Sequence, residues 1–208
     1  LRPELIVAPL EFHRANVLAK LEELKIPVLL LEATSLEQVF AHIHTLGRIF
    51  DRSTAAHAMT AEMRQQMAEI SRRTEGLPRT RVLYVINSQP LITVGPGSYI
   101  HQMIGLAGGI NIASQAVTAY PRLTMETVLK EDPEILIFPR GSVETVPRSE
   151  QEAWRRWTTL TAVQHNRLRE VSADALNRPG PRVMQGLEAL ARVIHPEAFV
   201  SESTTAQP

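Results

Sequence analysis

The stretch that decides the fold reads RSTAAHAMTAEMRQQMAEISRRTEG, from Arg52 to Gly76. Its apolar residues recur at steps of three and four, a spacing that places them along one face of an α-helix. Ser53 or Asp51 is expected to cap its start, and Gly76 with Pro78 is expected to end it. At 1.5 Å per residue the helix would be roughly 35 Å long. It is therefore either a surface helix of one domain or a rod between two. The apolar face consists of Ala56, Met59, Met63, Met67 and Ile70.

The sequences on either side of this helix repeat one pattern. RPELIVAP occupies residues 2–9 and DPEILIFP occupies residues 132–139. In each copy Pro-Glu opens a strand and a proline closes it, and a helix and a further apolar strand follow, at 28–31 or 168–171. A supersecondary unit repeated on both sides of a long helix predicts two similar lobes. The long helix is then a connector rather than a surface helix.

The fold class is therefore α/β, with two Rossmann-like lobes joined by a single long helix. We expect residues 1–51 to be the remnant of an N-terminal lobe, 52–76 the connecting helix, 77–199 the C-terminal lobe and 200–208 a disordered tail. The first lobe has two predicted strands, near 5–8 and 28–31, which leave too much edge for an independent sheet. We expect this lobe to be truncated or completed by another copy. The C-terminal strands are predicted at 81–86, 135–138 and 168–171, and further helices at 12–24, 36–50, 98–106, 124–130, 150–157 and 181–194.

The composition excludes several classes of function. Of the 208 residues 44% are hydrophobic, which is enough for a substantial core. Acidic and basic residues number 22 each, which argues against nucleic acid as a partner. The absence of cysteine excludes disulfides and thiolate metal sites. No apolar run approaches 18 residues, and no export signal is present in a sequence that begins directly with a strand.

The histidines do not form a recognisable metal site. His42 and His44 are two residues apart on a predicted helix, so they point about 200° apart and cannot share a metal. No ligand spacing of the H-E-x-x-H kind occurs. We therefore expect no metal site built by this chain and no resident cofactor. His13 is the one histidine placed directly after a predicted strand.

Two loops offer candidate binding residues before predicted helices. The loop from Gly95 to Ser98 can present backbone amides to an anion, although a turn and helix cap is the favoured interpretation. If this loop faces a cleft, Ile92 and Ser98 line it. Tyr120 lies in a polar loop, where it is either a lid over the local core or an aromatic platform for a flat ligand. The residues leave these two roles of Tyr120 equally open.

Charged residues mark two further positions. Glu126 lies in the first turn of a predicted helix, where it complements the helix dipole or is offered to an arginine of a partner protein. Asp174, Arg178 and Arg182 follow the last predicted strand, at the carboxyl edge of the sheet where open α/β sheets bind ligands. An Asp–Arg pair is often purely structural. Its place before the last helix nevertheless makes this loop the best site candidate.

The order of these motifs resembles the class III periplasmic substrate-binding proteins of ABC importers, which serve cobalamin, siderophores and haem. The resemblance covers nearly the whole chain and is greatest to the cobalamin-binding branch. It rests on the order and spacing of the segments together rather than on any one motif. The matching segments are 1–8, 26–37, 107–112 (AGGINI), 120–126 (YPRLTME), 132–137 (DPEILI) and 177–182 (NRPGPR), together with the long helix.

The resemblance implies a ligand held in a cleft between the lobes and an ABC permease at the membrane surface as partner. It implies a periplasmic or extracytoplasmic location and a ligand that is a tetrapyrrole or an iron chelate. Glu126 matches a glutamate that docks onto an arginine of the permease. Pro9 and Ile92 fall where the cobalamin binders have an aromatic residue. The ligand-contacting positions are Pro9, Ile92, Ser98, Tyr120, Asp174 and Arg178.

Three functions remain as alternatives. The first is a binding protein without catalysis, for cobalamin or a related corrinoid, or else for a ferric siderophore or haem. The second is an enzyme on the same frame, such as a tetrapyrrole metal chelatase, which would need a metal-binding and proton-accepting pair at a cleft edge, with His13 as the candidate. The third is a signalling or scaffold lobe that has lost transport.

Overall fold

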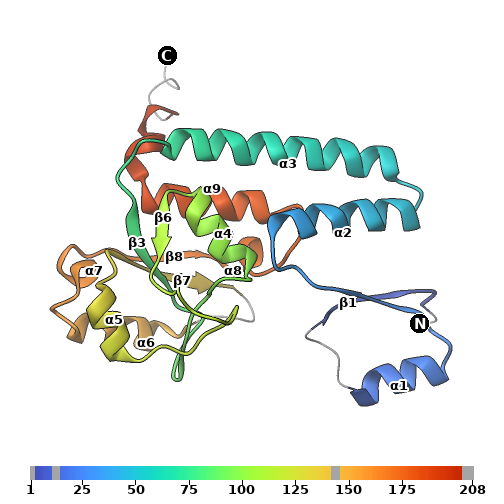
Figure 1. Ribbon diagram of the computed structural model, residues 1–208, viewed down its shortest axis with the longest axis horizontal. Helices are drawn as coiled ribbons and strands as arrows, with labels where there is room; N and C mark the ends of the chain where they lie inside the picture. The colour runs from blue at the N-terminus through green and yellow to red at the C-terminus, as the bar shows by residue number, and fades with distance from the viewer. Residues whose placement is uncertain (1–2, 11–14, 142–145, 203–208) are drawn as a thin grey trace.

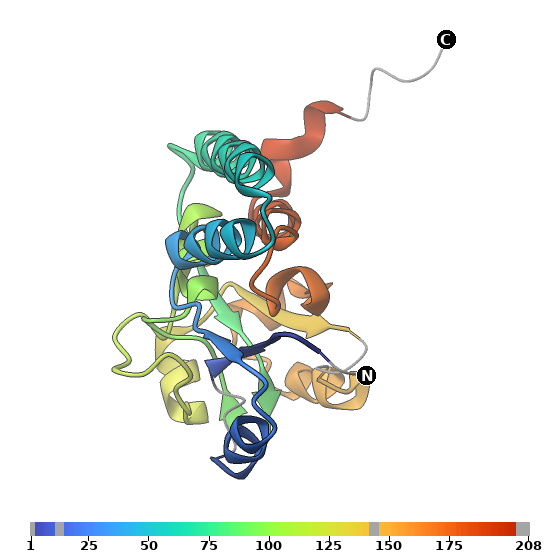
Figure 2. The same cartoon turned by 90° about the vertical axis from the view of Figure 1, so that its right-hand side faces the viewer.

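The long helix predicted from the sequence is present. The computed structural model describes residues 3–10, 15–141 and 146–202, and within them α3 runs from Ser53 to Thr74. It lies antiparallel to α2, Leu36–Ile49, and also packs against α9, Val183–Ile194 (Figure 1). Viewed along their axes, α3 rests on α2 and α9 together (Figure 2). The connector is thus anchored along its length to a helical layer.

The apolar face of α3 is buried in part. Ala56, Met63 and Ile70 are 3–6% exposed, whereas Met59 is 40% exposed and faces solvent. The predicted cap of this helix is wrong. Arg52 occupies the N-cap position without a side-chain hydrogen bond, because Asp51 adopts a left-handed turn with φ 51° that brings α3 directly back along α2. The short turn leaves no side-chain oxygen at the position that caps a helix.

The C-terminal half contains a four-stranded parallel sheet in the order β6-β3-β7-β8. Successive side chains of β3 enter different cores: Val82 and Tyr84 join a cluster with α2, α3, α4 and α9, while Leu83 joins a cluster on the opposite face. This alternation explains why the strand is continuously apolar. The four strands are β3 (Thr80–Tyr84), β6 (Gly109–Asn111), β7 (Ile135–Arg140) and β8 (Leu168–Ser172).

Side-chain caps fix the helices that the sequence predicted. The hydroxyls of Ser35, Ser98 and Thr124 accept backbone amides at the starts of α2, α4 and α5. Gln38 does not complete a capping box with Ser35, because its side chain instead accepts from the amide of Thr34 at 2.7 Å. The C-terminal helices are α4 (Tyr99–Leu106), α5 (Met125–Glu131), α6 (Arg148–Ala153), η2 (Trp154–Arg156), α7 (Thr161–Gln164), α8 (Ala173–Leu176) and η3 (Pro196–Glu202).

Several elements differ from the sequence-based expectation. β6 and the short hairpin of β4, Asn87–Ser88, and β5, Leu91–Ile92, were not predicted, since two- and three-residue strands carry too little pattern to recognise. The predicted helix at 181–194 begins at Val183. The predicted tail at 200–208 overlaps η3, which extends to Glu202, and residues 203–208 lie outside the described part of the chain.

The N-terminal part forms a separate small unit. β1, Ile6–Pro9, pairs in parallel with β2, Val28–Leu31, and α1, Ala15–Glu23, connects them. Within the described residues, neither hydrophobic cluster includes a residue of β1, α1 or β2. In Figure 1 this unit lies apart from the four-stranded sheet, below the α2–α3 pair. The α/β plan of two lobes joined through a long helix is therefore confirmed. Among the described residues no helix is both long and apolar enough to cross a membrane.

Candidate functional site

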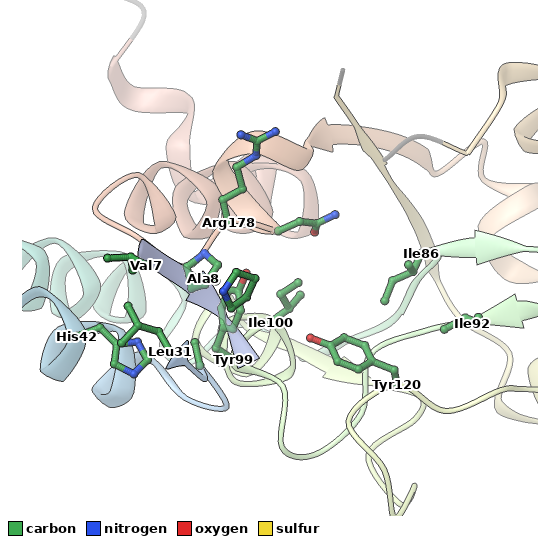
Figure 3. Close-up of a pocket in the computed structure, with 14 residues that line it drawn as sticks. Val7, Ala8, Leu31, His42, Ile86, Ile92, Tyr99, Ile100, Tyr120 and Arg178 are labelled. Carbon is green, nitrogen blue, oxygen red and sulfur yellow. The ribbon is translucent and has the colours of Figure 1, made fainter. Parts of the chain in front are cut away.

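A cavity of about 600 Å³ lies between the N-terminal unit and the C-terminal lobe. Its walls come from the carboxyl ends of β1, β2 and β3, which is where open parallel sheets place their ligands. Figure 3 shows Tyr120, Ile86 and Ile92 on one side and Val7, Leu31 and His42 on the other, with Ile100 between them. The lining residues are Val7, Ala8, Pro9, Leu31, Ala33, His42, Ile86, Ile92, Tyr99, Ile100, Tyr120, Asn177, Arg178 and Pro179.

Two buried tyrosines hold the loop that closes one side of the cavity. The hydroxyl of Tyr84 donates to Oδ1 of Asn177 at 2.8 Å, and the hydroxyl of Tyr99 donates to the carbonyl of Leu176 at 2.6 Å. Both rings are almost fully buried, with 0% and 3% of their surface exposed. Buried hydroxyls gain their partners at little cost in side-chain entropy when the rings are already packed. The loop after α8 is therefore fixed by the core.

A backbone ladder positions Tyr120. The amide of Thr93 donates to the carbonyl of Pro121 at 3.1 Å, and the amide of Gly95 donates to the carbonyl of Ala119 at 2.8 Å. These bonds hold the segment that carries Tyr120 against residues 93–95, which directly follow Ile92 at the end of β5. Tyr120 is 47% exposed, and its side chain points toward the cavity (Figure 3). It is therefore not a lid sealed into the core, and its role as an aromatic platform stays a prediction.

Four of the predicted contact residues come together in this cavity: Pro9, Ile92, Tyr120 and Arg178. Nε of Arg178 pairs with Oδ1 of Asp174 at 3.1 Å, and its guanidinium extends away from Tyr120 and Ile92 (Figure 3). The stem of Arg178 thus lines the cavity while its charge lies at the rim.

The other predicted site residues lie elsewhere. Ser98 is 2% exposed, its hydroxyl accepts from the amide of Ile100 at 3.2 Å, and it is not a lining residue. Asp174 likewise lies outside the lining and reaches the site only through Arg178. Glu126 is exposed in the first turn of α5, and the described residues offer it no ion pair. His13 lies outside the described residues.

The structure adds His42, which sequence reasoning did not select. His42 and His44 do point to different sides of α2, as expected: Nε2 of His44 meets Oγ1 of Thr60 in α3 at 2.7 Å, whereas His42 lines the cavity. Burial lowers the pKa of His42, which favours the neutral imidazole. Within the described residues, no three His, Asp or Glu side chains gather as a set of metal ligands. In the sequence, the indication for His42 is its position along the chain relative to the apolar strand at 28–31. Such a position is too weak a signal to select a binding residue by itself.

The cavity is largely apolar and lies between two α/β units, and comparisons with known proteins agree with this arrangement. Residues 1–175 match the model of a protein family described as Periplasmic binding protein.

This chain belongs to the periplasmic binding protein family.

Relatives of this binding protein include the vitamin B12-binding protein of Vibrio cholerae, 25% identical over 90% of the chain and 67% of the relative. An uncharacterised ABC transporter substrate-binding lipoprotein of Bacillus subtilis is 24% identical over 96% of the chain and 64% of that protein. The binding protein therefore spans about two thirds of the length of these relatives. One of these relatives is thus described by its ligand, vitamin B12, and the other as a substrate-binding lipoprotein of an ABC transporter.

Solved structures show the same fold. The periplasmic vitamin B12-binding protein of Vibrio cholerae superposes with a TM-score of 0.76 at 24% identity, covering 95% of this chain and 75% of that one. A periplasmic haem-binding protein of Roseiflexus gives 0.82 at 18% identity, covering 95% and 77%. A protein of an Fe³⁺-hydroxamate transport system from Saccharomonospora viridis gives 0.73 at 27% identity, covering 95% and 69%. The binding protein thus has the two-lobed plan of class III, with relatives among vitamin B12-binding proteins.

Proposed function

We propose that this chain is the substrate-binding component of an ABC importer and that it binds cobalamin or a related corrinoid between its lobes. The observation that carries the proposal is the cavity, which is lined mainly by apolar side chains from both α/β units. Its volume of about 600 Å³ lies within the range of small-molecule sites, roughly 300–1,000 Å³. The cavity receives one face of a large flat ligand, and the remainder stays exposed or meets other parts of the protein.

Tyr120 is the residue best placed to recognise a flat macrocycle. Its ring is held by the ladder to residues 93–95 and faces the cavity. An aromatic face packs on a conjugated ring by dispersion and quadrupole interactions. Pro9 and Ile92 supply aliphatic surface where the family resemblance leads us to expect aromatic residues. Tyr120 therefore carries the greater share of the stacking contact.

Delivery to a permease requires a surface feature that the importer recognises. Glu126 offers an exposed carboxylate at the N-terminal turn of α5, and complementary charge across such a contact fixes orientation and raises the association rate. We propose that Glu126 pairs with an arginine of the permease, and that the protein acts in the periplasm or at the outer face of the membrane. No catalytic step is part of this function.

A ferric siderophore or haem is the second candidate ligand. The observation that favours it is the imidazole of His42 in the cavity wall, because a neutral imidazole is a good ligand for iron. The similarity to a haem-binding protein and to an Fe³⁺-hydroxamate transport protein points the same way. Both candidate ligands would occupy the same cavity. They differ in the polar side chain that each requires from the wall of that cavity.

Equilibrium titration tests the proposal. The chain is titrated separately with cyanocobalamin, haemin and ferrichrome, and binding is followed by equilibrium dialysis and by the visible spectrum of each ligand. We expect cyanocobalamin to bind, and Tyr120→Ala to weaken that binding by about tenfold through loss of the aromatic contact. Leu129→Ala, on the exposed side of α5, is the matched control and should bind normally. Failure of all three ligands to bind would reject the proposed class of function, and selective binding of haemin or ferrichrome would select the second candidate.

A further inference from the structure

The N-terminal wall of the cavity is apolar except at one position. The strands β1 and β2 and the residues after them contribute Val7, Ala8, Pro9, Leu31 and Ala33. Among the described lining residues, His42 of α2 is the one polar side chain from this half of the chain. A ligand that touches this wall therefore meets hydrocarbon everywhere except at the imidazole. The described side chains of this wall can therefore distinguish polar from apolar groups of a ligand through the imidazole of His42 alone.

α2 holds His42 on a rigid support. Leu36, Val39 and Phe40 are 0–1% exposed in the main core, and the amide of Leu36 donates to Oε1 of Gln102 in α4 at 2.9 Å. β1 and β2, by contrast, contribute nothing to either described cluster. A shift of the N-terminal unit would therefore change the apolar part of the wall and leave the imidazole in place. His42 belongs mechanically to the C-terminal lobe.

The imidazole of His42 has no hydrogen-bond partner among the described side chains and backbone groups. His44, on the other side of the same helix, is bonded to Thr60 at 2.7 Å, and its ring contacts that of His57 at a tilt of 43°, with 4.3 Å between ring centroids. A neutral imidazole offers one N–H donor and one nitrogen acceptor. In a wall that is otherwise apolar, both are available to whatever occupies the cavity. A half-buried polar ring without a protein partner is a natural point of ligand contact.

We propose that His42, as a neutral imidazole, hydrogen-bonds an uncharged polar group of the ligand and makes ligand binding weaken at acid pH. This inference rests on the proposed function of the cavity as the ligand site. Amide groups at the edge of a corrinoid, or the carbonyl oxygens of a hydroxamate, have the required chemistry. His42 then selects ligands with an uncharged donor or acceptor at this position over purely apolar ones.

The direction of the pH effect follows from burial. Burial of the ring is the cause of the lowered pKa of His42. A ligand that covers the ring removes more water and disfavours imidazolium further. By linkage, protonation then weakens binding, and affinity falls as the pH drops through the lowered pKa of His42, which lies below the ordinary value of 6.5.

Charged groups on the surrounding elements do not reverse this sign. Those on the elements packed against α2, and those around the cavity, have other partners or are exposed. Glu37 pairs with Arg64 of α3 at 2.6 Å, and Arg178 pairs with Asp174 at 3.1 Å. His101 of α4 hydrogen-bonds with Asn111 at 3.0 Å, and Glu32, after β2, is exposed. The remaining titratable groups of the cavity lining are Tyr99 and Tyr120.

The test measures the affinity for cyanocobalamin, haemin and ferrichrome between pH 5 and pH 8, in wild type, His42→Gln, His42→Phe and His165→Gln. We expect the wild-type affinity for a bound ligand to fall by up to about tenfold per pH unit once the pH is below the lowered pKa of His42. His42→Gln should keep most of the affinity at pH 8 and lose the acid weakening, because its amide hydrogen-bonds without titrating. His42→Phe should bind about three- to tenfold more weakly at pH 8. His165→Gln, which replaces an exposed histidine at the end of α7, should match wild type.

The outcomes separate this inference from the proposed function. If wild type binds a ligand with an affinity that does not change with pH, or if His42→Gln keeps the acid weakening, the role of His42 is refuted while the binding function stands. Affinity that rises toward acid pH would mean that imidazolium meets an anion, which also refutes a neutral contact. If wild type binds none of the three ligands, the proposed function fails and this inference fails with it. Near-ultraviolet circular dichroism of each variant establishes that the fold is intact.

Discussion

Gly95→Ala is the substitution whose effect the structure determines most directly. Gly95 is buried, and a Cβ placed there would overlap the carbonyl oxygen of Thr118 and lie 3.1 Å from Cδ of Pro121. The clashing oxygen belongs to the backbone and cannot rotate away. The Tyr120 segment must therefore move by about 1 Å to restore ordinary van der Waals contact. Such a movement strains or breaks the 2.8 Å bond from the amide of Gly95 to the carbonyl of Ala119.

Overpacking of this kind costs about 1–3 kcal/mol, and the lost hydrogen bond about 1 kcal/mol more. We expect Gly95→Ala to reduce the free energy of unfolding by about 2–4 kcal/mol in urea titrations. The melting temperature should fall by about 4–16 °C, at about 2–4 °C per kcal/mol for a chain of this size. Because Tyr120 is carried on the displaced segment, ligand affinity should fall as well.

Gly105→Ala is the matched control. Gly105 lies in α4, and a Cβ there would meet nothing within 4 Å. The same change should therefore leave stability unchanged or raise it by up to about 1 kcal/mol, since alanine favours the helix. A free energy of unfolding for Gly95→Ala within about 0.5 kcal/mol of wild type, the scale of a neutral surface change, would refute the close approach argued above.

Three further perturbations have outcomes that follow from the structure. Tyr99→Phe removes the bond to the carbonyl of Leu176 and should cost about 1–2 kcal/mol in chemical denaturation, with no loss if that carbonyl finds another donor. Burial acts to raise the pKa of Asp132, but its bonds from Thr161, at 2.9 and 2.7 Å, and the charge of Arg81 lower it overall. Asp132→Asn should therefore be less stable than wild type at neutral pH, by less than about 1 kcal/mol because the carboxylate is partly exposed. This difference in the free energy of unfolding should vanish as the pH falls below the ordinary 3.8 and through the lowered pKa of Asp132. A difference that does not change with pH would contradict this. Glu126→Arg should leave ligand affinity unchanged and reduce uptake in a reconstituted importer, and unchanged uptake would exclude the proposed docking role.

Much of the fold could be read from local spacing. The apolar periodicity of residues 53–74 predicts α3 within two residues, and the hydroxyls of Ser35, Ser98 and Thr124 mark the starts of helices. Each of these signals depends on groups a few residues apart. The repeated Pro-Glu strand also predicts the parallel pairing of each half correctly. The unpredicted strand β6 pairs with β3, about 30 residues earlier in the chain, whereas the strands of the unpredicted β4–β5 hairpin pair locally but are only two residues long each.

The candidate site could be read only in part. Position at the carboxyl edge of the sheet selects the loop of Arg178, the loops before predicted helices offer Ile92 and Tyr120, and the family resemblance adds Pro9. Chemistry alone does not distinguish Ser98, whose hydroxyl caps a helix, from a ligand contact. Nor does it separate His42 from His44, because Thr60, which bonds His44, and the walls of the cavity that His42 lines both come from elements distant in sequence. The type of a residue is thus weaker evidence for a ligand contact than the direction in which the folded helix points its side chain.

The sequence by itself determined that this protein has two α/β units and a long connecting helix, because helix period, strand alternation and capping act within a few residues. The tertiary structure alone decided what that helix packs against and which side chains meet across the cavity. It buried Met63 against the helical layer and left Met59 in solvent, and it set His42 opposite Tyr120. Such contacts depend on the relative placement of units joined by distant segments, and no local pattern records that placement.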